Sequence, residues 1–259
     1  MIEYFLGFNI THLQITLDGG PNDHNHNRPL INGQPTFDHI LSNIKRAVNA
    51  GLDIIIRVNI WKPNAENVGE LYDILESNGL KNKVRVIVKP VLSSSANQCQ
   101  STCLRANKSA KIIVGIYLEA AKKGWIVLPG LDYMQGHEFC IVDSMGQFII
   151  DPLGMLYKCG ECFDESESVG KIRRNGTFQL DEKKWMKWVG KDPLLFLECR
   201  RCALLPICMG GCSMKRYWKP EESPCLEFKR EFDNLLIVML LMSQMPQKKE
   251  VRDEKNQKR

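Results

Sequence analysis

The chain has 259 residues, 44% of them hydrophobic and 25% charged, which is ordinary for a globular protein of one or two domains. Its net charge of +5 is weak evidence for nucleic-acid binding, because six basic and three acidic residues place +3 of it in the last dozen residues, a tail expected to be disordered. The N-terminus lacks the features of a signal peptide, and the longest uncharged apolar run, 235–242, is far shorter than the roughly 20 residues of a membrane span. We therefore expect a cytoplasmic protein without a membrane partner.

Hydrophobic periodicity divides the first part of the chain into alternating strands and helices. In chain order we expect a strand at 13–18, a helix at 37–48, a strand at 54–60, a helix at 68–75 and a strand at 84–90. Thr36 stands where the first helix would be capped, and Gly51 where it would stop. This order predicts parallel strands joined by right-handed crossovers, as in half of an α/β barrel. Three strands cannot close a barrel, so we expect a preceding segment.

The composition changes after about residue 95, where a second unit rich in cysteines and turns begins. A helix is expected at 109–123, and hairpin arms at 148–151 and 155–158. Asp151-Pro152-Leu153-Gly154 has the signature of a type I turn between these arms, and the second arm delivers Cys159. The apolar run at 235–242 is expected to form a buried helix.

Cysteine spacing carries most of the functional information in this sequence. Ten cysteines in a reducing compartment are more often metal ligands than disulfides. Eight of them lie in one segment: Cys140, Cys159, Cys162, Cys199, Cys202, Cys208, Cys212 and Cys225. Eight is two sets of four, and four thiolates hold either a [4Fe–4S] cluster or a tetrahedral zinc ion. Gly210 and Gly211 let the backbone approach a bulky centre closely, which favours a cluster, while structural zinc remains the alternative.

The complete pattern resembles a known module. Cys140, Gly154-x4-Cys159, Cys199-x2-Cys202-x5-Cys208-x3-Cys212 and Cys225 match the seven-cysteine pattern of the SPASM domain of radical-SAM peptide-modifying enzymes. The segment LQITLDGG through IIIRVNI resembles the second half of the radical-SAM barrel of anaerobic sulfatase-maturating enzymes and ribosomal-peptide maturases. The resemblance implies an α/β fold in which the C-terminal half of a partial TIM barrel at 1–97 precedes a Cys-rich α+β SPASM domain at 98–245, with a disordered tail at 246–259.

The same resemblance implies the ligand sets of two auxiliary [4Fe–4S] clusters. One set is Cys199, Cys202, Cys208 and Cys225, and the other is Cys140, Cys159 and Cys212. The fourth ligand of the second cluster is open: it is either Cys162 or an exogenous group, and Cys162 as an unrelated free thiol is the alternative.

A pocket for S-adenosylmethionine is also implied, lined by Thr16, Asp18, Arg57 and Asn59. The cofactor's hydroxyls, ammonium and carboxylate call for such partners. A satisfied polar group at a strand end is the alternative for each of them. For His24 and Arg28, in the predicted loop after Asp18, we favour a solvated loop.

Two departures from the family pattern limit the expected activity. No C-x3-C-x2-C motif is present for the cluster that cleaves the cofactor, and Cys99-x3-Cys103-x2-Ala106 lacks the third of three required thiolates. The cofactor is therefore expected only if a separate N-terminal radical-SAM fragment supplies the missing half. Gly160 stands where the sulfatase-maturating enzymes carry an aspartate base, which favours a maturase that forms a thioether or carbon–carbon crosslink in a peptide or protein substrate. No catalytic residue is assigned.

Two other functions stay open beside the peptide maturase. One is a non-catalytic iron–sulfur or zinc module that binds a peptide or nucleic acid through the basic and aromatic stretches 183–188 and 215–219. Such stretches are more often an amphipathic helix and a solvated face, so a nucleic-acid partner is not expected. The other is an inactive gene fragment with an exposed sheet edge.

Overall fold

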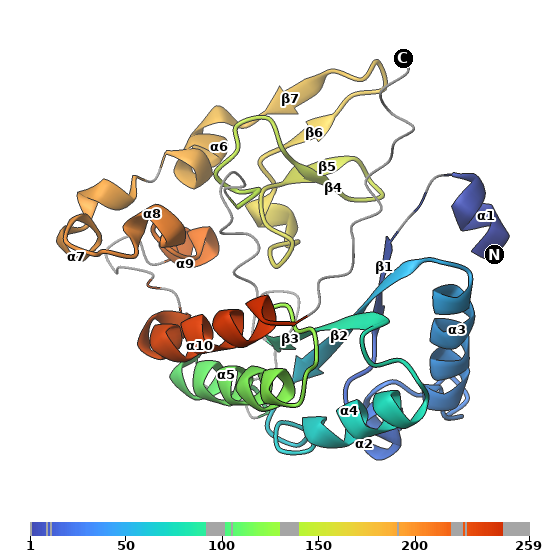
Figure 1. Ribbon diagram of the computed structural model, residues 1–259. Helices are drawn as coiled ribbons and strands as arrows, with labels where there is room; N and C mark the ends of the chain where they lie inside the picture. The colour runs from blue at the N-terminus through green and yellow to red at the C-terminus, as the bar shows by residue number, and fades with distance from the viewer. Residues whose placement is uncertain are drawn as a thin grey trace, which may run out of the picture.

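The computed structural model contains a parallel sheet with helices on one face and a smaller Cys-rich unit on the other side (Figure 1). The structure describes residues 2–8, 10, 12–91, 102–104, 106–129, 140–190, 192–218, 225 and 227–245. Within these residues no helix is both long and apolar enough to cross a membrane. The expected tail at 246–259 and the cysteine at position 99 lie outside them.

The sheet has three parallel strands in the order in which they occur in the chain. They are β1 (His12–Thr16), β2 (Asp53–Ile60) and β3 (Val84–Pro90). Thr16 lies beside Arg57 in the register of β1 and β2, and Asn59 lies beside Lys89 in that of β2 and β3. The predicted order and parallel direction of the strands are confirmed.

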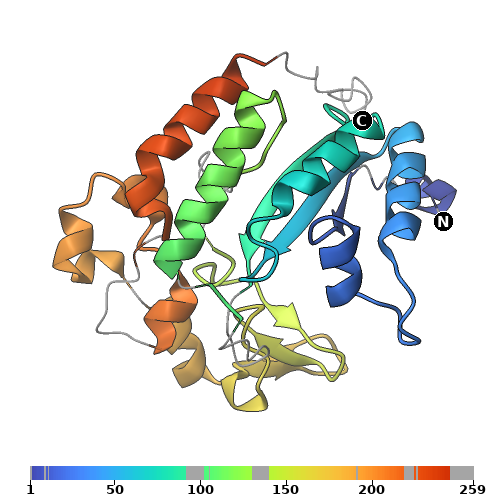
Figure 2. The same ribbon diagram turned by 90° about the horizontal axis from the view of Figure 1, so that it is seen from below.

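Burial along β2 explains why this segment forms a strand. Ile54, Ile56, Val58 and Ile60 are fully buried, while the residues between them are half-buried. The buried face packs against α3 (Phe37–Asn49) and α4 (Val68–Ser77), which cover the sheet from one side (Figure 2). The alternate face, which carries Arg57 and Asn59, is left free of these helices, and polar side chains are therefore tolerated on it.

Two further helices extend this layer. α5 (Ala106–Lys122) packs into the same hydrophobic core through Ile113 and Tyr117, and Val127 forms a parallel bridge with Val86. α10 (Phe232–Ser243) returns from the Cys-rich unit to lie beside α5, as both views show (Figures 1 and 2). Packing thus joins both helices to the sheet, although α5 was expected in the second unit. The boundary at residue 97 stays a prediction.

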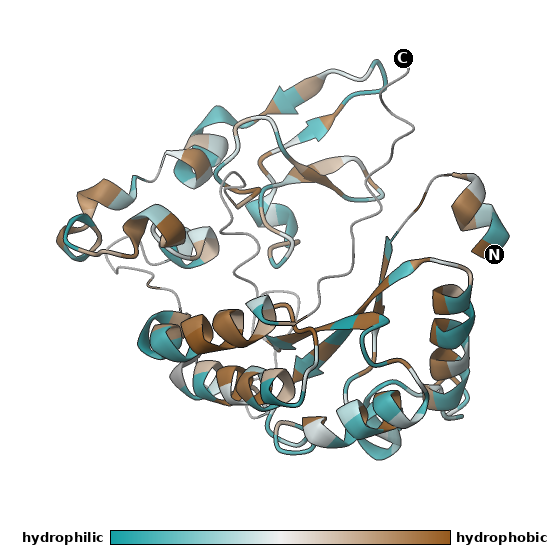
Figure 3. Ribbon diagram, viewed as in Figure 1, coloured by the Kyte–Doolittle hydropathy of each residue, from teal (hydrophilic) through white to brown (hydrophobic). Residues whose placement is uncertain are grey.

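The predicted buried helix at 235–242 is buried on one side only. Leu235 and Val238 have no exposed surface, but the side chains of Leu236 and Leu240 are 47% and 59% exposed. Hydrophobic residues continue around the helix, which is brown along much of its length in Figure 3. The apolar run therefore predicted the helix correctly, but it did not predict that one side of the helix is exposed.

The Cys-rich unit is built on a small antiparallel sheet of four short strands, with a core that includes Val142, Leu156 and Trp188. The strands are β4 (Ile149–Ile150), β5 (Met155–Tyr157), β6 (Gly170–Ile172) and β7 (Phe178–Leu180). Its helices are α6 (Glu182–Val189), α7 (Leu197–Arg200), α8 (Leu205–Cys208) and α9 (Ser213–Trp218). Short 3-10 turns occupy Glu165–Glu167, Pro193–Leu195 and, before α10, Glu227–Glu231.

The turn between β4 and β5 has the predicted chemistry. The Gly154 amide donates to the Asp151 carbonyl at 3.0 Å, and the Leu153 amide donates to the Asp151 carboxylate at 2.9 Å. Gly154 has φ +80, which a glycine adopts without strain. The turn therefore fixes the hairpin that leads into Cys159.

Candidate functional site

The segment after β1 is a helix rather than the solvated loop that we expected. Pro21 begins α2 (Pro21–Asn27), where the fixed φ of proline favours the first helical position. His24 lies on this helix with no exposed surface, and Arg28 follows it. The solvated-loop interpretation is wrong for His24, which the helix buries, whereas Arg28 follows the helix with a side chain that is 45% exposed and forms an ion pair with Asp18.

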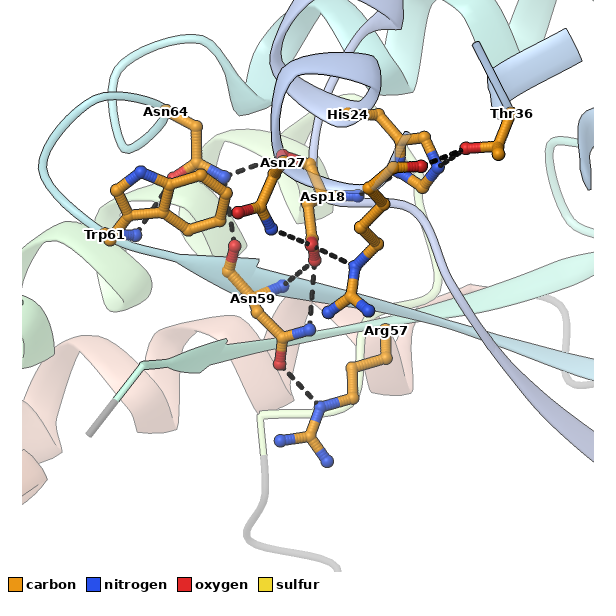
Figure 4. Close-up of polar contacts among 9 residues, drawn as sticks. Asp18, His24, Asn27, Thr36, Arg57, Asn59, Trp61 and Asn64 are labelled. Atoms are coloured by element: carbon orange, nitrogen blue, oxygen red, sulfur yellow. Dashed lines mark hydrogen bonds and ion pairs between the residues drawn. The ribbon is translucent and has the colours of Figure 1, made fainter. Parts of the chain in front are cut away.

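Asp18 stands at the centre of a polar network at the ends of β1 and β2 (Figure 4). One carboxylate oxygen accepts hydrogen bonds from the Asn59 backbone amide at 2.9 Å and from Asn59 Nδ2 at 3.0 Å. The other accepts from Asn27 Nδ2 at 2.9 Å and from Arg28 Nε at 2.5 Å. Asp18 has no exposed surface, and its four acceptor positions are all used. Its carboxylate orients neighbouring side chains and presents no free oxygen to a ligand.

His24 is held as a neutral imidazole beneath this carboxylate. Its Nδ1 accepts from the Asp18 backbone amide at 3.2 Å, so Nε2 carries the proton and donates to Thr36 Oγ1 at 3.1 Å. The Thr36 hydroxyl in turn donates to the Arg28 carbonyl at 2.6 Å. Burial lowers the pKa of His24, and the positive charge of Arg28 lowers it further, against an opposing effect of Asp18. The imidazole is therefore a connector in the network.

Sequence reasoning missed Asn64, which has no exposed surface and ties the two strand ends together. Its Nδ2 donates to the backbone carbonyls of Asp18 at 2.6 Å and of Asn59 at 3.0 Å, and its Oδ1 accepts from the Trp61 amide at 2.9 Å. An asparagine shortly after the end of a strand is a turn signal. That signal gives no hint of the contact with Asp18, which is 46 residues away in the chain.

Arg57, Thr16 and Asn59 occupy the face of the sheet that α3 and α4 leave free. Arg57 Nε donates to Asn59 Oδ1 at 2.8 Å, which fixes the direction of the guanidinium (Figure 4). No described residue accepts from its terminal nitrogens, so this half-buried cation has donors for a carboxylate or phosphate ligand. The structure thus brings the four predicted cofactor residues together, with Asp18 behind the surface and Arg57 on it.

Four of the predicted cluster cysteines line one cavity. It has a volume of about 20 Å³, more than the space for one water molecule, and its walls include Cys199, Cys202, Cys208 and Cys225. Glu198, Leu204, Leu205, Gly210 and Lys229 complete the lining. The ligand set implied by the resemblance, drawn from positions up to 26 residues apart, therefore coincides with one cavity of the fold.

The backbone beside this cavity has an unusual conformation. Met209, Gly210 and Gly211 all have positive φ, at 48°, 84° and 75°. A Cβ on Gly210 would lie 2.4 Å from Pro193 Cβ and 3.0 Å from Arg216 Nη1. Only glycine therefore fits at this close approach to Pro193 and Arg216, while the predicted approach of Gly210 to a metal centre stays a prediction.

The cysteines of the second predicted set are also near one another. Cys159 and Cys212 both act electrostatically on Cys140 and, with burial as the largest cause, raise its pKa. The Cys162 thiol donates a hydrogen bond to Cys159, which lowers the pKa of Cys159 to about 7 and raises that of Cys162. A sulfur that is readily deprotonated is the form that binds metals. Cys162 is buried and lies within hydrogen-bond distance of Cys159.

The described cysteines do not gather around a single point. Among the described residues, no group of three or more His, Cys, Asp and Glu side chains is placed to hold one metal ion. The eight cysteines of both sets, Cys162 included, are free, whereas Cys103 is disulfide-bonded. The expectation that thiols prevail over disulfides therefore fails at this one position.

The two basic and aromatic stretches are helices. α6 buries Trp188 and exposes Lys183 and Lys187, while Lys184 is half-buried, as expected of an amphipathic helix. In α9, by contrast, Arg216 is only 1% exposed, so the prediction of a solvated face there is wrong. Arg216 Nη2 donates to Asp143 Oδ1 at 2.6 Å, which satisfies its charge inside the unit.

No protein-family model and no curated protein matches this sequence significantly. Solved structures do. A structure of anSMEcpe with bound AdoMet and the Cp18Cys peptide aligns with a TM-score of 0.66 at 16% identity, covering 92% of this chain and 71% of that one. A second anSMEcpe structure, with bound AdoMet, gives a TM-score of 0.64 at 16% identity, with 93% and 71% covered. SuiB from Streptococcus suis, bound to S-adenosylmethionine, gives 0.52 at 15% identity, with 82% and 52% covered.

The likeness defines the class of fold to which the chain belongs. It is a mixed α/β fold with a parallel sheet, shared with structures that hold S-adenosylmethionine and, in one case, a peptide. The agreement extends over both the sheet and the Cys-rich unit, because about nine-tenths of the chain is covered by the alignment to anSMEcpe.

Proposed function

We propose that the chain is the iron–sulfur-binding C-terminal part of a radical-SAM peptide-modifying enzyme. In this proposal the sheet is the second half of a partial TIM barrel, and the Cys-rich unit is a SPASM domain with two auxiliary [4Fe–4S] clusters. The observation that carries the proposal is the cavity lined by Cys199, Cys202, Cys208 and Cys225. The fold shared with anSMEcpe and SuiB supports it.

The donor set of this cavity fits an iron–sulfur cluster better than zinc. Four sulfurs on one zinc ion, at about 2.3 Å from the metal, lie within about 4 Å of one another. In a cluster each cysteine binds a different iron, so the sulfurs surround a volume instead of a point. The cavity lined by Cys199, Cys202, Cys208 and Cys225 is the observation that supports the second arrangement in this proposal.

The cysteines of the second set would hold the other cluster. Cys140, Cys159 and Cys212 provide three ligands, and the hydrogen bond from Cys162 to Cys159 supports Cys162 as the fourth. A bound cluster supplies a one-electron redox centre and an anchoring point for sulfur or nitrogen ligands. The protein's own contribution is to fix the sulfur positions.

The polar face of the sheet is proposed to bind the cofactor's charged end. Arg57 offers its terminal nitrogens to a carboxylate, and Thr16 lies beside it in the sheet register. Asp18 acts through Asn59, which in turn directs Arg57. The sequence contains no C-x3-C-x2-C motif, so the step that cleaves the cofactor is not assigned to this chain.

The substrate is proposed to be a peptide, as in the anSMEcpe structure with the Cp18Cys peptide. Gly160 has no side chain with which to accept a proton, and this disfavours the sulfatase type of reaction. A thioether or carbon–carbon crosslink in a ribosomal peptide is the reaction class that we favour.

Metal and sulfide analysis of anaerobically purified protein tests the proposal. We expect about eight irons and eight sulfides per chain, and about half of each in a Cys202→Ala variant, because one of two four-iron clusters loses a ligand. Ser101→Ala serves as a matched control with unchanged cysteines. Zinc without iron or sulfide would overturn the proposal, and iron that is unchanged in Cys202→Ala would overturn the ligand assignment.

A further inference from the structure

A buried lysine forms hydrogen bonds with the loop that begins at Cys140. Lys158 is only 1% exposed, and it follows β5 and directly precedes Cys159. Its ammonium donates to the backbone carbonyls of Ser144 at 2.5 Å, Gln147 at 2.7 Å and Ile141 at 3.3 Å. These three acceptors use all three donors of the ammonium. A single side chain thus fixes the path of residues 141–147.

A buried arginine holds the same loop from another direction. Arg216 Nη2 donates to Asp143 Oδ1 at 2.6 Å and to Ser213 Oγ at 2.5 Å. The Ser213 hydroxyl donates to the same Asp143 oxygen at 2.9 Å. Both residues belong to α9, which begins directly after Cys212, and the Arg216 amide donates to the Cys212 carbonyl at 3.2 Å. The network therefore connects α9 to the Asp143 carboxylate.

The three cysteines of the second set, Cys140, Cys159 and Cys212, all lie next to the residues that make these contacts or at the start of the loop that the contacts hold. Cys140 opens the loop, and its carbonyl accepts from the Asp143 amide at 2.8 Å. Cys159 is next to Lys158, and Cys212 is next to Ser213. The two cations therefore join the three chain segments that carry Cys140, Cys159 and Cys212.

Burial of two cations requires a reason, because removing a charge from water is unfavourable unless the surroundings compensate it. A methionine would fill the space of Lys158 without that penalty. Asp143 forms an ion pair with Arg216, whereas the Lys158 ammonium is bound by three backbone carbonyls, which carry no net charge. Thiolate ligands and a cluster bring negative charge to this place, and the two cations would balance it.

We propose that Lys158 and Arg216 are positioning residues that hold Cys140, Cys159 and Cys212 in place as one metal site and offset its negative charge. This inference rests on the proposed function and adds two residues to it that the cysteine pattern does not contain. The ligand of the site is an iron–sulfur cluster bound by thiolates.

The test uses the full chain, reconstituted anaerobically with iron and sulfide, in an EPR-monitored redox titration. Lys158→Met removes one positive charge, Asp143→Asn removes one negative charge while its oxygen still accepts from Arg216, and Lys171→Met alters an exposed lysine of β6 as the control. A positive charge beside a cluster favours its reduced form, so Lys158→Met is expected to lower the midpoint potential of one cluster signal and Asp143→Asn to raise it. Lys171→Met is expected to change neither.

The iron content gives a second readout. Lys158→Met is expected to lose up to about half of the bound iron, and Lys158→Arg, which keeps the charge, to recover part of it. Opposite potential shifts in the two charge variants are not expected of residues that only stabilise the fold. If Lys158→Met does not fold, the upward shift in Asp143→Asn decides the question. Unchanged midpoint potentials in the variants that fold, or shifts in the same direction, would overturn this inference and leave the proposed function intact. If the parent protein binds neither iron nor sulfide, the proposed function itself is overturned.

Discussion

Replacing Asp18 with alanine is expected to destabilise the protein strongly. Two of the four donors that it satisfies, the backbone amide and Nδ2 of Asn59, lie in a part-buried position and would lose their acceptor. Each unpaired buried donor costs about 1–3 kcal/mol, so we expect a loss of about 2–6 kcal/mol in the free energy of unfolding. The donors of Asn27 and Arg28 are exposed and would turn to water, and they add little to this sum.

Urea denaturation followed by circular dichroism measures this loss as a lower transition midpoint. Asp73→Ala is the control, because Asp73 is 73% exposed and its ion pair with Lys123 spans 3.9 Å, a type worth less than about 1 kcal/mol. A midpoint for Asp18→Ala that falls no further than that of Asp73→Ala would refute the reasoning. It would mean that the Asn59 donors find other acceptors once the carboxylate is removed.

Three further predictions follow from local geometry. Burial holds the pKa of His24 below its unfolded value near 6.5, so the stability that the neutral imidazole contributes is complete above that pH. It is lost as the pH falls below 6.5, by at most about 1.4 kcal/mol per pH unit. His24→Gln should remove this pH dependence from the urea midpoints, and the control His26→Gln, at an exposed position, should retain it. Asn25→Ala should lower the free energy of unfolding by about 1–2 kcal/mol, because the Asn25 oxygen accepts from the Thr36 and Phe37 amides at the start of α3, both at 2.9 Å. An unchanged thermal midpoint would contradict this. Met209→Gly should stabilise the fold by about 0.5–1 kcal/mol, because φ 48° strains a non-glycine residue, and a lower melting temperature would count against it.

The regular elements of the sheet were predictable because their signal is local. Alternating isoleucines at 54–60 gave β2 to within one residue, and a period of 3.6 residues gave α3. The cap of α3 was not predictable. Thr36 occupies the expected position, yet its hydroxyl forms hydrogen bonds with the His24 imidazole and the Arg28 carbonyl instead of capping the helix. Asn25, 11 residues away in the chain, caps the helix. Local pattern thus located the helix, while tertiary contact decided which side chain caps it.

The candidate sites divide in the same way. The resemblance to the SPASM pattern implied which cysteines belong to each ligand set, and the four cysteines of one set line a common cavity. The burial of Lys158 and Arg216 was not predicted, because basic residues are mostly exposed and nothing in the neighbouring sequence marks these two as buried. The burial of His24 was not predicted, because the seven-residue helix that begins at Pro21 has no apolar period from which it could be recognised.

The return of α10 to α5 would give a metal centre in the cavity of the first cysteine set a mechanical role. Cys225 and Lys229 approach the cavity from the segment that leads into α10, and this segment is anchored on α5 through Phe228 and Leu235. Cys199, Cys202 and Cys208 approach it from the Cys-rich unit. A metal centre there would act as a staple that closes a loop of chain between the two units. Loss of the metal would then loosen the whole molecule, and unfolding of the two units would be cooperative only while the staple holds.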